Sequence, residues 1–246
     1  MIKFFSFGPA FGLPSPSPFC MKLEVWMKMA GIEYRTKVRK DPTQGPKGKL
    51  PFIKHGGVVV ADSDIIIDYL SQSFEVELDR ELTPHQRATG YAISKMLEDH
   101  LYWAMLYSRW VDPNNWKAMR THFMGHMPLP VRRIMAGLVR LKVKKDLHSQ
   151  GMGRHSAQDV YWAAKRDLRV VSTLLGDNRF LFGDEPCSYD AVVYGFIANV
   201  IDCELESPLK EFGRSHDNLV HYCQRMHERY YAATEVKSVD GQPQAA

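Results

Sequence analysis

The pattern of apolar residues changes at about residue 75, and this change constrains the fold more than any other feature of the chain. Before it, short apolar runs typical of strands alternate with helical repeats. After it, apolar residues recur every three or four positions almost throughout, as they do in amphipathic helices. The sequence therefore predicts an α+β unit followed by an all-helical unit.

The first unit is predicted to follow the order strand, helix, strand, then strand, strand, helix. A Gly-Gly pair at 56 and 57 marks a hairpin between the last two strands. Gly31 is placed to end the first helix. The predicted segments are 2–7, 18–30, 34–38, 51–54, 58–61 and 63–73.

The second unit is predicted to consist of helices over 84–110, 129–147, 157–175, 188–200 and 216–232. The most apolar of these, 188–200, is expected at the centre of the helical unit. We expect domains at 1–74 and 84–235, joined by a linker at about 75–82. The polar tail 236–246 is expected to be disordered.

Composition excludes several classes of protein. The chain has 246 residues, of which 45% are apolar, and this is enough to bury a core. A net charge of +4 is too small to demand nucleic acid as a partner. No apolar stretch reaches ~18 residues, so no transmembrane helix is expected. The start, MIKFFSFGPAFG, lacks the features of a signal peptide.

Cysteine and histidine spacing points to a reducing compartment and to no metal site. The cysteines at 20, 187, 203 and 223 show no CxxC or disulfide-framework pattern, which favours free thiols and a cytoplasmic location. His122 and His126 have helical i, i+4 spacing but lack an evident third ligand, so we predict no metal.

The segment Ser17-Pro18-Phe19-Cys20 opens a predicted helix directly after the first strand and its loop. A helix start offers unpaired N–H groups and the positive end of the helix dipole, which together stabilise a thiolate. A hydroxyl at Ser17 would add a hydrogen-bond donor. Two alternatives stay open: Ser17 is only the N-cap before Pro18, or Ser15 supplies the hydroxyl.

Cys20 lies one turn further along the same helix and has two interpretations. Because Ser17 stands where a redox pair would need a second cysteine, Cys20 cannot form an internal disulfide there. It remains a candidate for a mixed disulfide with a thiol ligand. The alternative is a buried, inert thiol, since reactivity requires exposure and a low pKa.

Three motifs resemble the glutathione transferase family in the order and spacing expected of it. They are SPSPFCMKLEVW, GKLPFI followed by ADS, and FLFGDEPCSYDAVVYGFIA. The resemblance covers roughly residues 1–233 and implies a thioredoxin-like N-terminal domain, an all-α C-terminal domain and a homodimer. The string SPFC-x-K-x-E-x-W-x-K-M-A is most similar to the metaxin-like branch, which includes the failed-axon-connections proteins and bacterial relatives.

The resemblance implies a set of glutathione contacts. Leu50 would pair its backbone with the cysteinyl part of glutathione before a cis Pro51. Asp62 and Ser63 would hold the γ-glutamyl end at a helix start, as anion binding there predicts; the alternative is a plain N-cap. Lys47, Lys49 and Lys54 are all candidates for the partner of the glycyl carboxylate, and the sequence does not distinguish between them. We take Lys49 as the predicted partner.

An aromatic band on the first long helix is the candidate pocket for an apolar electrophile. The predicted lining is Phe11, Leu13, Tyr102, Leu106 and Trp110, with Trp110 as the most exposed member. The alternative is that most of this band belongs to a domain or dimer core.

Two further segments depart from the simplest pattern. At the start of helix 188–200, Cys187 replaces the usual Ser or Thr cap, so we expect Ser188 to serve as the cap.

Residues 129–146 carry six basic side chains against Asp146 alone, a net charge of +5 from +6 and −1. The default interpretation is a solvated helix face, and the alternative is a surface for a membrane or an acidic partner.

These observations predict a glutathione transferase-like protein that binds glutathione and conjugates it to a small apolar electrophile through a Ser-stabilised thiolate. Two alternatives from other classes stay open. One is a non-catalytic, metaxin-like adaptor. The other is a glutathione oxidoreductase that uses Cys20, against which the missing cysteine at position 17 argues.

Overall fold

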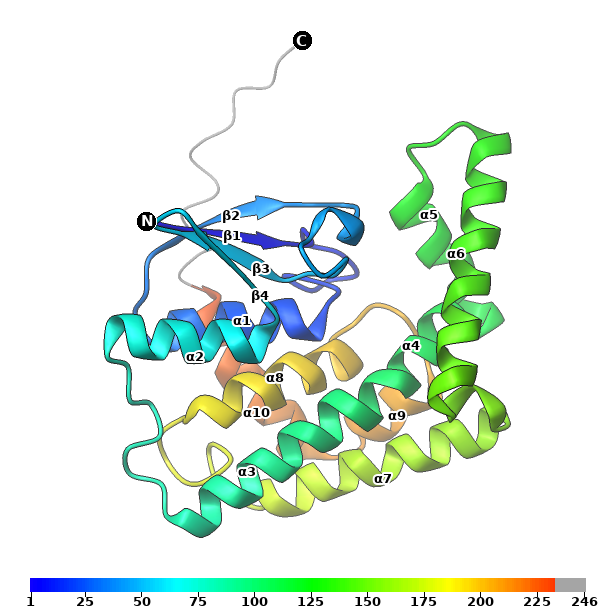
Figure 1. Ribbon diagram of the computed structural model, residues 1–246. Coiled ribbons are helices and arrows are strands. Elements are labelled where there is room, and N and C mark those ends of the chain that lie inside the picture. Colours follow the sequence, from blue (N-terminus) through cyan, green and yellow to red (C-terminus); the bar gives the residue numbers. More distant parts are fainter. Residues whose placement is uncertain (233–246) are drawn as a thin grey trace.

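In the computed structural model, which describes residues 1–232, a small β-sheet covers two helices, and further helices lie beneath and beside them (Figure 1). The sheet order is β2-β1-β3-β4. β1 pairs in parallel with β2 and antiparallel with β3, and β3 pairs antiparallel with β4. The strands are β1 (Ile2–Ser6), β2 (Tyr34–Val38), β3 (Phe52–His55) and β4 (Val58–Ala61).

Two helices, α1 (Pro18–Met29) and α2 (Ser63–Phe74), cover one face of this sheet (Figure 1). Ser17 caps α1, and Pro18 occupies the first helical position, where its missing N–H costs nothing. Gly31 follows the end of α1 with a φ of 65°. The predicted order of strands and helices is confirmed. A short 3-10 turn, η1 (Pro42–Gln44), lies in the loop before β3.

The helical part begins at Pro84 and is α-helical almost throughout. Its elements are α3 (Pro84–Met96), η2 (Leu97–Leu101), α4 (Tyr102–Trp110), α5 (Pro113–Met124), α6 (Leu129–Gln150), η3 (Met152–Arg154), α7 (Ala157–Leu175), α8 (Ser188–Ile201), α9 (Pro208–Arg214) and α10 (Asp217–Tyr230). None of the helices within residues 1–232 combines the length and apolar content needed to span a bilayer. The predicted tail 236–246 lies outside the described residues.

Two parts of this layout differ from the sequence prediction. The single helix expected over 84–110 contains a π-helical turn, η2, where Leu97, Glu98 and Leu101 are all buried. A wider turn shifts the phase of the helix, which apolar spacing does not reveal. The helices α5 and α9 were not predicted, because α5 is mostly polar and α9 has only 7 residues.

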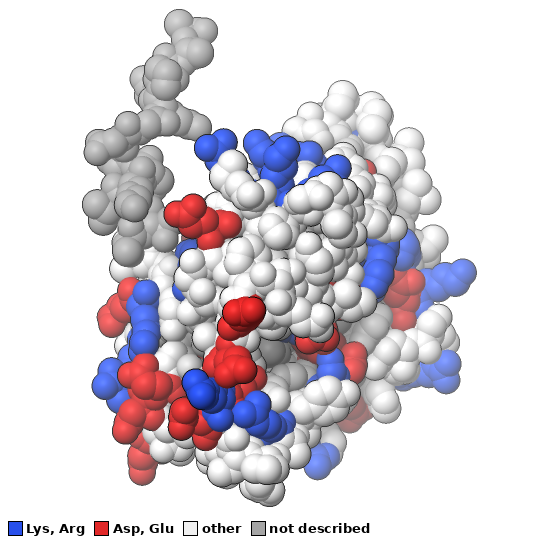
Figure 2. All heavy atoms as spheres, turned by 60° about the vertical axis from the view of Figure 1, so that its left-hand side comes forward, with Lys and Arg blue, Asp and Glu red and all other residues white. Residues whose placement is uncertain are grey.

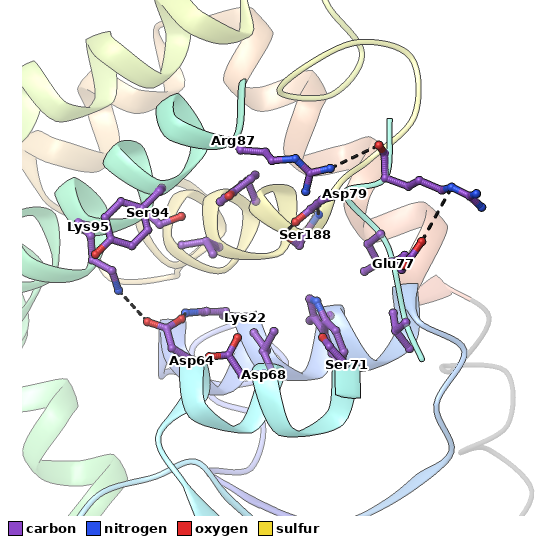
Figure 3. Close-up of a pocket in the computed structure, with 18 residues that line it drawn as sticks. Lys22, Asp64, Asp68, Ser71, Glu77, Asp79, Arg87, Ser94, Lys95 and Ser188 are labelled. Carbon is purple, nitrogen blue, oxygen red and sulfur yellow. Dashed lines mark hydrogen bonds and ion pairs between the residues drawn. The ribbon is translucent and has the colours of Figure 1, made fainter. Parts of the chain in front are cut away.

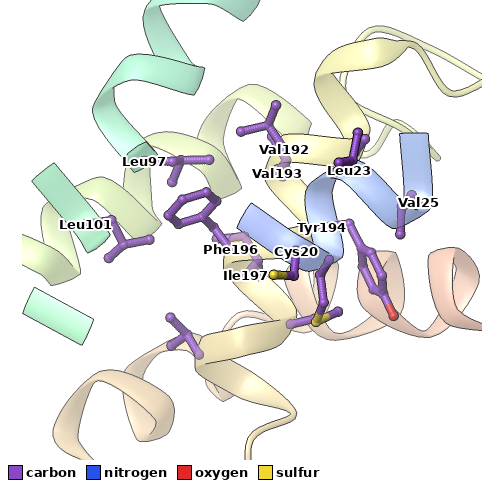
Figure 4. Packing of buried hydrophobic residues seen from close by; sticks show 14 of the residues in the cluster. Cys20, Leu23, Val25, Leu97, Leu101, Val192, Val193, Tyr194, Phe196 and Ile197 are labelled. Carbon is purple, nitrogen blue, oxygen red and sulfur yellow. The ribbon is translucent and has the colours of Figure 1, made fainter. Parts of the chain in front are cut away.

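The buried helix α8 is the centre of the core, as its composition predicted. Figure 4 shows Val192, Phe196 and Ile197 of α8 between Cys20 of α1 and Leu97 of η2. Gly195 permits this close packing. A Cβ there would lie 2.8 Å from the Pro18 carbonyl oxygen and 2.9 Å from the Lys22 nitrogen.

The prediction that Ser188 caps α8 was wrong, because Cys187 is the N-cap residue. The buried carboxylate of Asp190 accepts from the Cys187 N–H at 2.9 Å, so the cap position needs no side-chain oxygen of its own. The same carboxylate accepts from the Leu181 N–H at 2.9 Å. The Ser188 N–H and hydroxyl instead donate to Asp79 in the linker, which ties the linker to α8.

Gly195→Ala is expected to destabilise the protein, because the added methyl group meets backbone atoms that cannot rotate away. The free energy of unfolding should fall by about 1–3 kcal/mol, as in other overpacked cores. Urea unfolding followed by circular dichroism measures it.

Gly137→Ala is the matched control, since nothing lies within 4 Å of its Cβ position on an exposed part of α6. It should leave stability unchanged or raise it by up to about 1 kcal/mol. Equal effects of the two substitutions would contradict the close approach of α1 and α8.

Candidate functional site

One edge of the sheet brings together the segments predicted to contact glutathione. β1 ends there at Ser6, and the loop that follows leads into α1. β3 runs antiparallel to β1 and begins at the same edge, with Phe52 opposite Phe5. β4 ends there, since Ala61 lies opposite Phe52. The starts of α1 and α2 therefore lie at the same edge as residues 50–51.

The segment before β3 and the start of α2 have special backbone geometry. The Leu50–Pro51 bond is cis, as predicted. Asp62 caps α2, and its carboxylate accepts from the Asp64 N–H at 3.1 Å. Its φ of 93° is rare for a residue with a side chain and is of the kind found at ligand sites. Ser63, the first residue of α2, is buried, whereas Lys49 is exposed on the preceding loop.

Ser17 and Ser15 are distinguished by burial. The Ser17 hydroxyl is half-buried and accepts weakly from the Cys20 N–H at 3.4 Å. A hydroxyl that accepts keeps its own proton for donation. Ser15 is buried, and its hydroxyl accepts from the Ser17 N–H at 3.3 Å. The cap role of Ser17 is therefore present, and its hydroxyl is the more accessible of the two.

Cys20 has a sulfur enclosed by its neighbours, with 0% of the residue exposed. Burial raises the pKa of its thiol, although hydrogen bonds from Ser6 and Ser17 act in the opposite direction. A neutral, enclosed thiol lacks the exposure and low pKa that reactivity requires. Of the two interpretations of Cys20, this environment favours the buried, inert thiol.

The backbone before Ser17 is held from the helical domain by Arg109 of α4 and Asn199 of α8. The buried Arg109 guanidinium donates to the carbonyl oxygen of Pro16 and, at 2.9 Å, to the side-chain oxygen of Asn199. Asn199 in turn donates to the Ser15 carbonyl oxygen at 3.4 Å. Within residues 1–232 no carboxylate pairs with Arg109, so its positive charge stays uncompensated close to the start of α1.

The helix α5, which the sequence did not predict, supplies most of an aromatic wall beside the loop between β1 and α1. Phe123 meets Phe7 with ring centroids 5.9 Å apart, and His122 meets Phe11 at 4.9 Å. Phe123 also contacts Trp110 at 5.6 Å. The structure therefore links two of the predicted pocket residues, Phe11 and Trp110, through side chains that sequence analysis missed.

The other predicted pocket residues are less accessible or lie further along the helix. Tyr102 contacts Phe19 of α1 at 5.1 Å, Leu106 is half-buried and Leu13 is buried. Trp110 was predicted to be the exposed member of the band but is half-buried between Phe123 and Trp116, whose ring lies 6.1 Å away. The aromatic rings in the segment THFMGH are the sequence signal for this wall. We considered the two histidines only as metal ligands and therefore missed it.

A cleft of about 810 Å³ lies between α2 and α3 and does not include Ser17, Leu50, Pro51 or Ser63 (Figure 3). Charges of both signs are interspersed on the linker side of the molecule (Figure 2). Two residues that line the cleft, Lys22 and Lys95, both pair with Asp64, and both also pair with the buried Glu98; each Lys95 contact measures 2.7 Å. Because Asp64 directly follows Ser63, this network fixes the start of α2 against α1.

Comparison with known proteins matches both halves of the chain to family models. Residues 18–115 match the glutathione S-transferase N-terminal domain, and residues 164–226 match the glutathione S-transferase C-terminal domain. Failed axon connections from Drosophila melanogaster is 34% identical; the match covers 89% of this chain but only 55% of that protein.

Two further relatives are similar over most of their own length. Isoprene-epoxide–glutathione S-transferase from Rhodococcus sp. (strain AD45) is 31% identical over 94% of this chain and 99% of that protein. Metaxin-3 from Danio rerio is 30% identical over 100% of this chain and 81% of that protein.

Solved structures show the same fold. The β-etherase LigF from Sphingobium sp. strain SYK-6 superposes with a TM-score of 0.61 at 18% identity, covering 97% of this chain and 99% of that one. The apo form of human glutathione-S-transferase T1-1 gives 0.59 at 16% identity, covering 99% and 92%. These likenesses confirm the expected fold.

The native protein is expected to have no rapidly reacting thiol, because all four cysteines are free and buried. Reaction with a disulfide reagent at pH 8 should be at least about 100-fold slower than that of free cysteine, since access requires local opening. Unfolding in guanidinium should release all four thiols at once. A fast thiol identified as Cys20 by mass spectrometry would contradict this account of its environment.

Proposed function

Because this chain belongs to the glutathione transferase superfamily, in its metaxin-like branch, we propose that it binds glutathione at the sheet edge where β1 ends and conjugates it through its sulfur to a small apolar electrophile. The observation that carries the proposal is the convergence there of two helix starts and the Leu50–Pro51 segment.

The start of α2 is the proposed site for the γ-glutamyl end. Ser63 and the N–H groups of the first turn other than that of Asp64 suit a carboxylate, and the Asp62 carboxylate suits the amino group beside it. Asp64 would repel the ligand if its charge were uncompensated, but Lys22 and Lys95 both pair with it. The Leu50 backbone would pair with the cysteinyl part and Lys49 with the glycyl carboxylate.

The start of α1 is the proposed site for the sulfur. A free thiol has a pKa of about 8.5, and the helix dipole and a hydrogen bond from Ser17 both favour the thiolate. The uncompensated charge of Arg109, which contacts the carbonyl oxygen before Ser17, acts in the same direction. Cys20 takes no part in this mechanism, because it is buried in neutral form.

The reaction step is a nucleophilic displacement or ring opening. The thiol proton leaves to water, the thiolate sulfur forms a bond to carbon, and the leaving group departs with its bonding electron pair. With an epoxide, the ring oxygen takes that pair and is then protonated by water. The aromatic side chains Phe7, Phe11 and Phe123 would line the apolar acceptor pocket. Epoxides are the first class to test, given the name of the Rhodococcus relative.

A second candidate function is a metaxin-like adaptor, which the similarity to metaxin-3 favours. It predicts no saturable binding of glutathione. In either case we propose a cytoplasmic homodimer, since the cysteines are free and the family resemblance implies dimers. The oxidoreductase alternative lacks support, because Cys20 is enclosed.

Ser63→Ala is expected to weaken glutathione binding about 5- to 30-fold, because a charge-assisted hydrogen bond of about 1–2 kcal/mol is lost. Isothermal titration calorimetry measures the affinity. Ser73→Ala, on an exposed part of the same helix, is the control and should bind like the parent protein. Unchanged affinity in Ser63→Ala would remove Ser63 from the site.

Ser17→Ala is expected to raise the pKa of bound glutathione by about 1–2 units, since a hydrogen bond to a charged group contributes about 1.5–3 kcal/mol. Thiolate absorbance against pH measures it. The lost cap should cost only ~1 kcal/mol of stability.

Cys20→Ala is the control and should leave this titration nearly unchanged. A shift in Cys20→Ala without one in Ser17→Ala would reverse the assignment. If glutathione does not bind the parent protein at all, the adaptor function is the better account.

A further inference from the structure

The outward face of α6 carries a continuous row of large apolar side chains. These residues are 39 to 65% exposed. Their spacing places them on one side of the helix, opposite the buried residues Ala136 and Leu147. The row consists of Val131, Ile134, Met135, Leu138 and Leu141. In α6 the protein therefore covers one apolar face and leaves a second one exposed.

The position of α6 keeps this row free within the described part of the chain. Figure 1 shows α6 at the edge of the molecule, with α4 and α5 on its inner side. Arg140, on the inner face of α6, holds this helix to the end of α4. It donates to the carbonyl oxygens of Trp110 at 3.0 Å and Val111 at 2.8 Å. Its guanidinium also lies 4.8 Å from the ring centroid of Trp116.

The charges around the row are almost all positive. Arg140 is engaged inward, and Lys142 pairs with Asp146 at 2.7 Å. By helical spacing the exposed Lys145 lies within the row and the exposed Lys144 on its flank, whereas Arg133 lies toward the inner side. Neither α5 nor α6 contains an acidic residue other than Asp146.

We propose that this outward face of α6 docks onto a membrane surface that contains anionic lipids. The helix would lie in the plane of the headgroups, with its exposed apolar row at the acyl boundary and its basic side chains on lipid phosphates or carboxylates. From Val131 to Leu141 the row is about 15 Å long, from ten steps of about 1.5 Å. The proposal does not depend on glutathione binding.

Two features favour a membrane over other occupants. A second copy meeting this face through a two-fold axis would place basic residues against basic residues. All five residues of the row belong to one helix at the edge of the molecule. A flat anionic surface can therefore contact the whole length of the row. The charge of the face and the chemistry of the lipid headgroups are therefore complementary.

Vesicle flotation with the full chain tests the proposal. The protein should float with vesicles of phosphatidylcholine and phosphatidylserine, should bind vesicles of phosphatidylcholine alone about tenfold less, and should be released by salt. The double variants Ile134→Ser/Leu138→Ser and Lys144→Glu/Lys145→Glu should each lose at least about tenfold in binding.

Matched controls separate the face from general surface properties. Trp162→Ser removes a similarly exposed apolar side chain from α7, and Lys3→Glu/Lys37→Glu removes exposed charges from the sheet. Both should bind like the parent protein.

Three results would overturn the proposal. The first is no binding to anionic vesicles, and the second is equal binding by the α6 variants. The third is a dimer in sedimentation velocity that Ile134→Ser/Leu138→Ser abolishes without any lipid binding by the parent protein, which would assign the face to a second copy. Circular dichroism of each variant shows whether the fold is retained.

Discussion

The close approach of α1 to α8 at Gly195 is the constraint on which the rest of the structure depends. It brings the backbone of α1 into contact with the central helix of the other domain, with no side chain between them. Arg109 and Asn199 then hold the two residues before Ser17 by their carbonyl oxygens. The start of α1 is therefore fixed by the helical domain as much as by the sheet, which is what a site for a thiolate needs.

Local sequence signals were sufficient for much of this fold. The change of periodicity near residue 75 predicted the two parts, and the motif order predicted the family and the cis bond at Leu50–Pro51. Features set by tertiary contacts were missed. The π-helical turn at Leu97–Leu101 depends on what the helix packs against. The role of α5 depends on ring contacts between residues far apart in the sequence, Phe7 and Phe123. The cap of α8 was misassigned because Asp190 supplies its hydrogen bonds from inside the helix.

Charge compensation differs sharply between the regions of the molecule. Next to Ser63, two lysines compensate two carboxylates, and Lys22 is only 1% exposed in this network. Removing one partner of such a buried network leaves an unpaired buried charge, which is strongly destabilising. The network therefore holds its side chains in fixed positions. Arg109 is buried against the carbonyl oxygen of Pro16, one residue before Ser17, without a carboxylate partner among residues 1–232, and α6 presents cations to solvent. The two uncompensated regions are the ones to which we assign anionic ligands, a thiolate and a lipid surface.

The most direct test of the proposed glutathione site is a titration of the isotopically labelled protein with glutathione, followed by amide chemical shifts. The account predicts saturable shifts at Ser17, Leu50 and Ser63, and none at Ser71 and Ser188 in the cleft between α2 and α3. Shifts confined to that cleft would contradict the location of the site. The absence of any saturable shift would contradict glutathione binding itself.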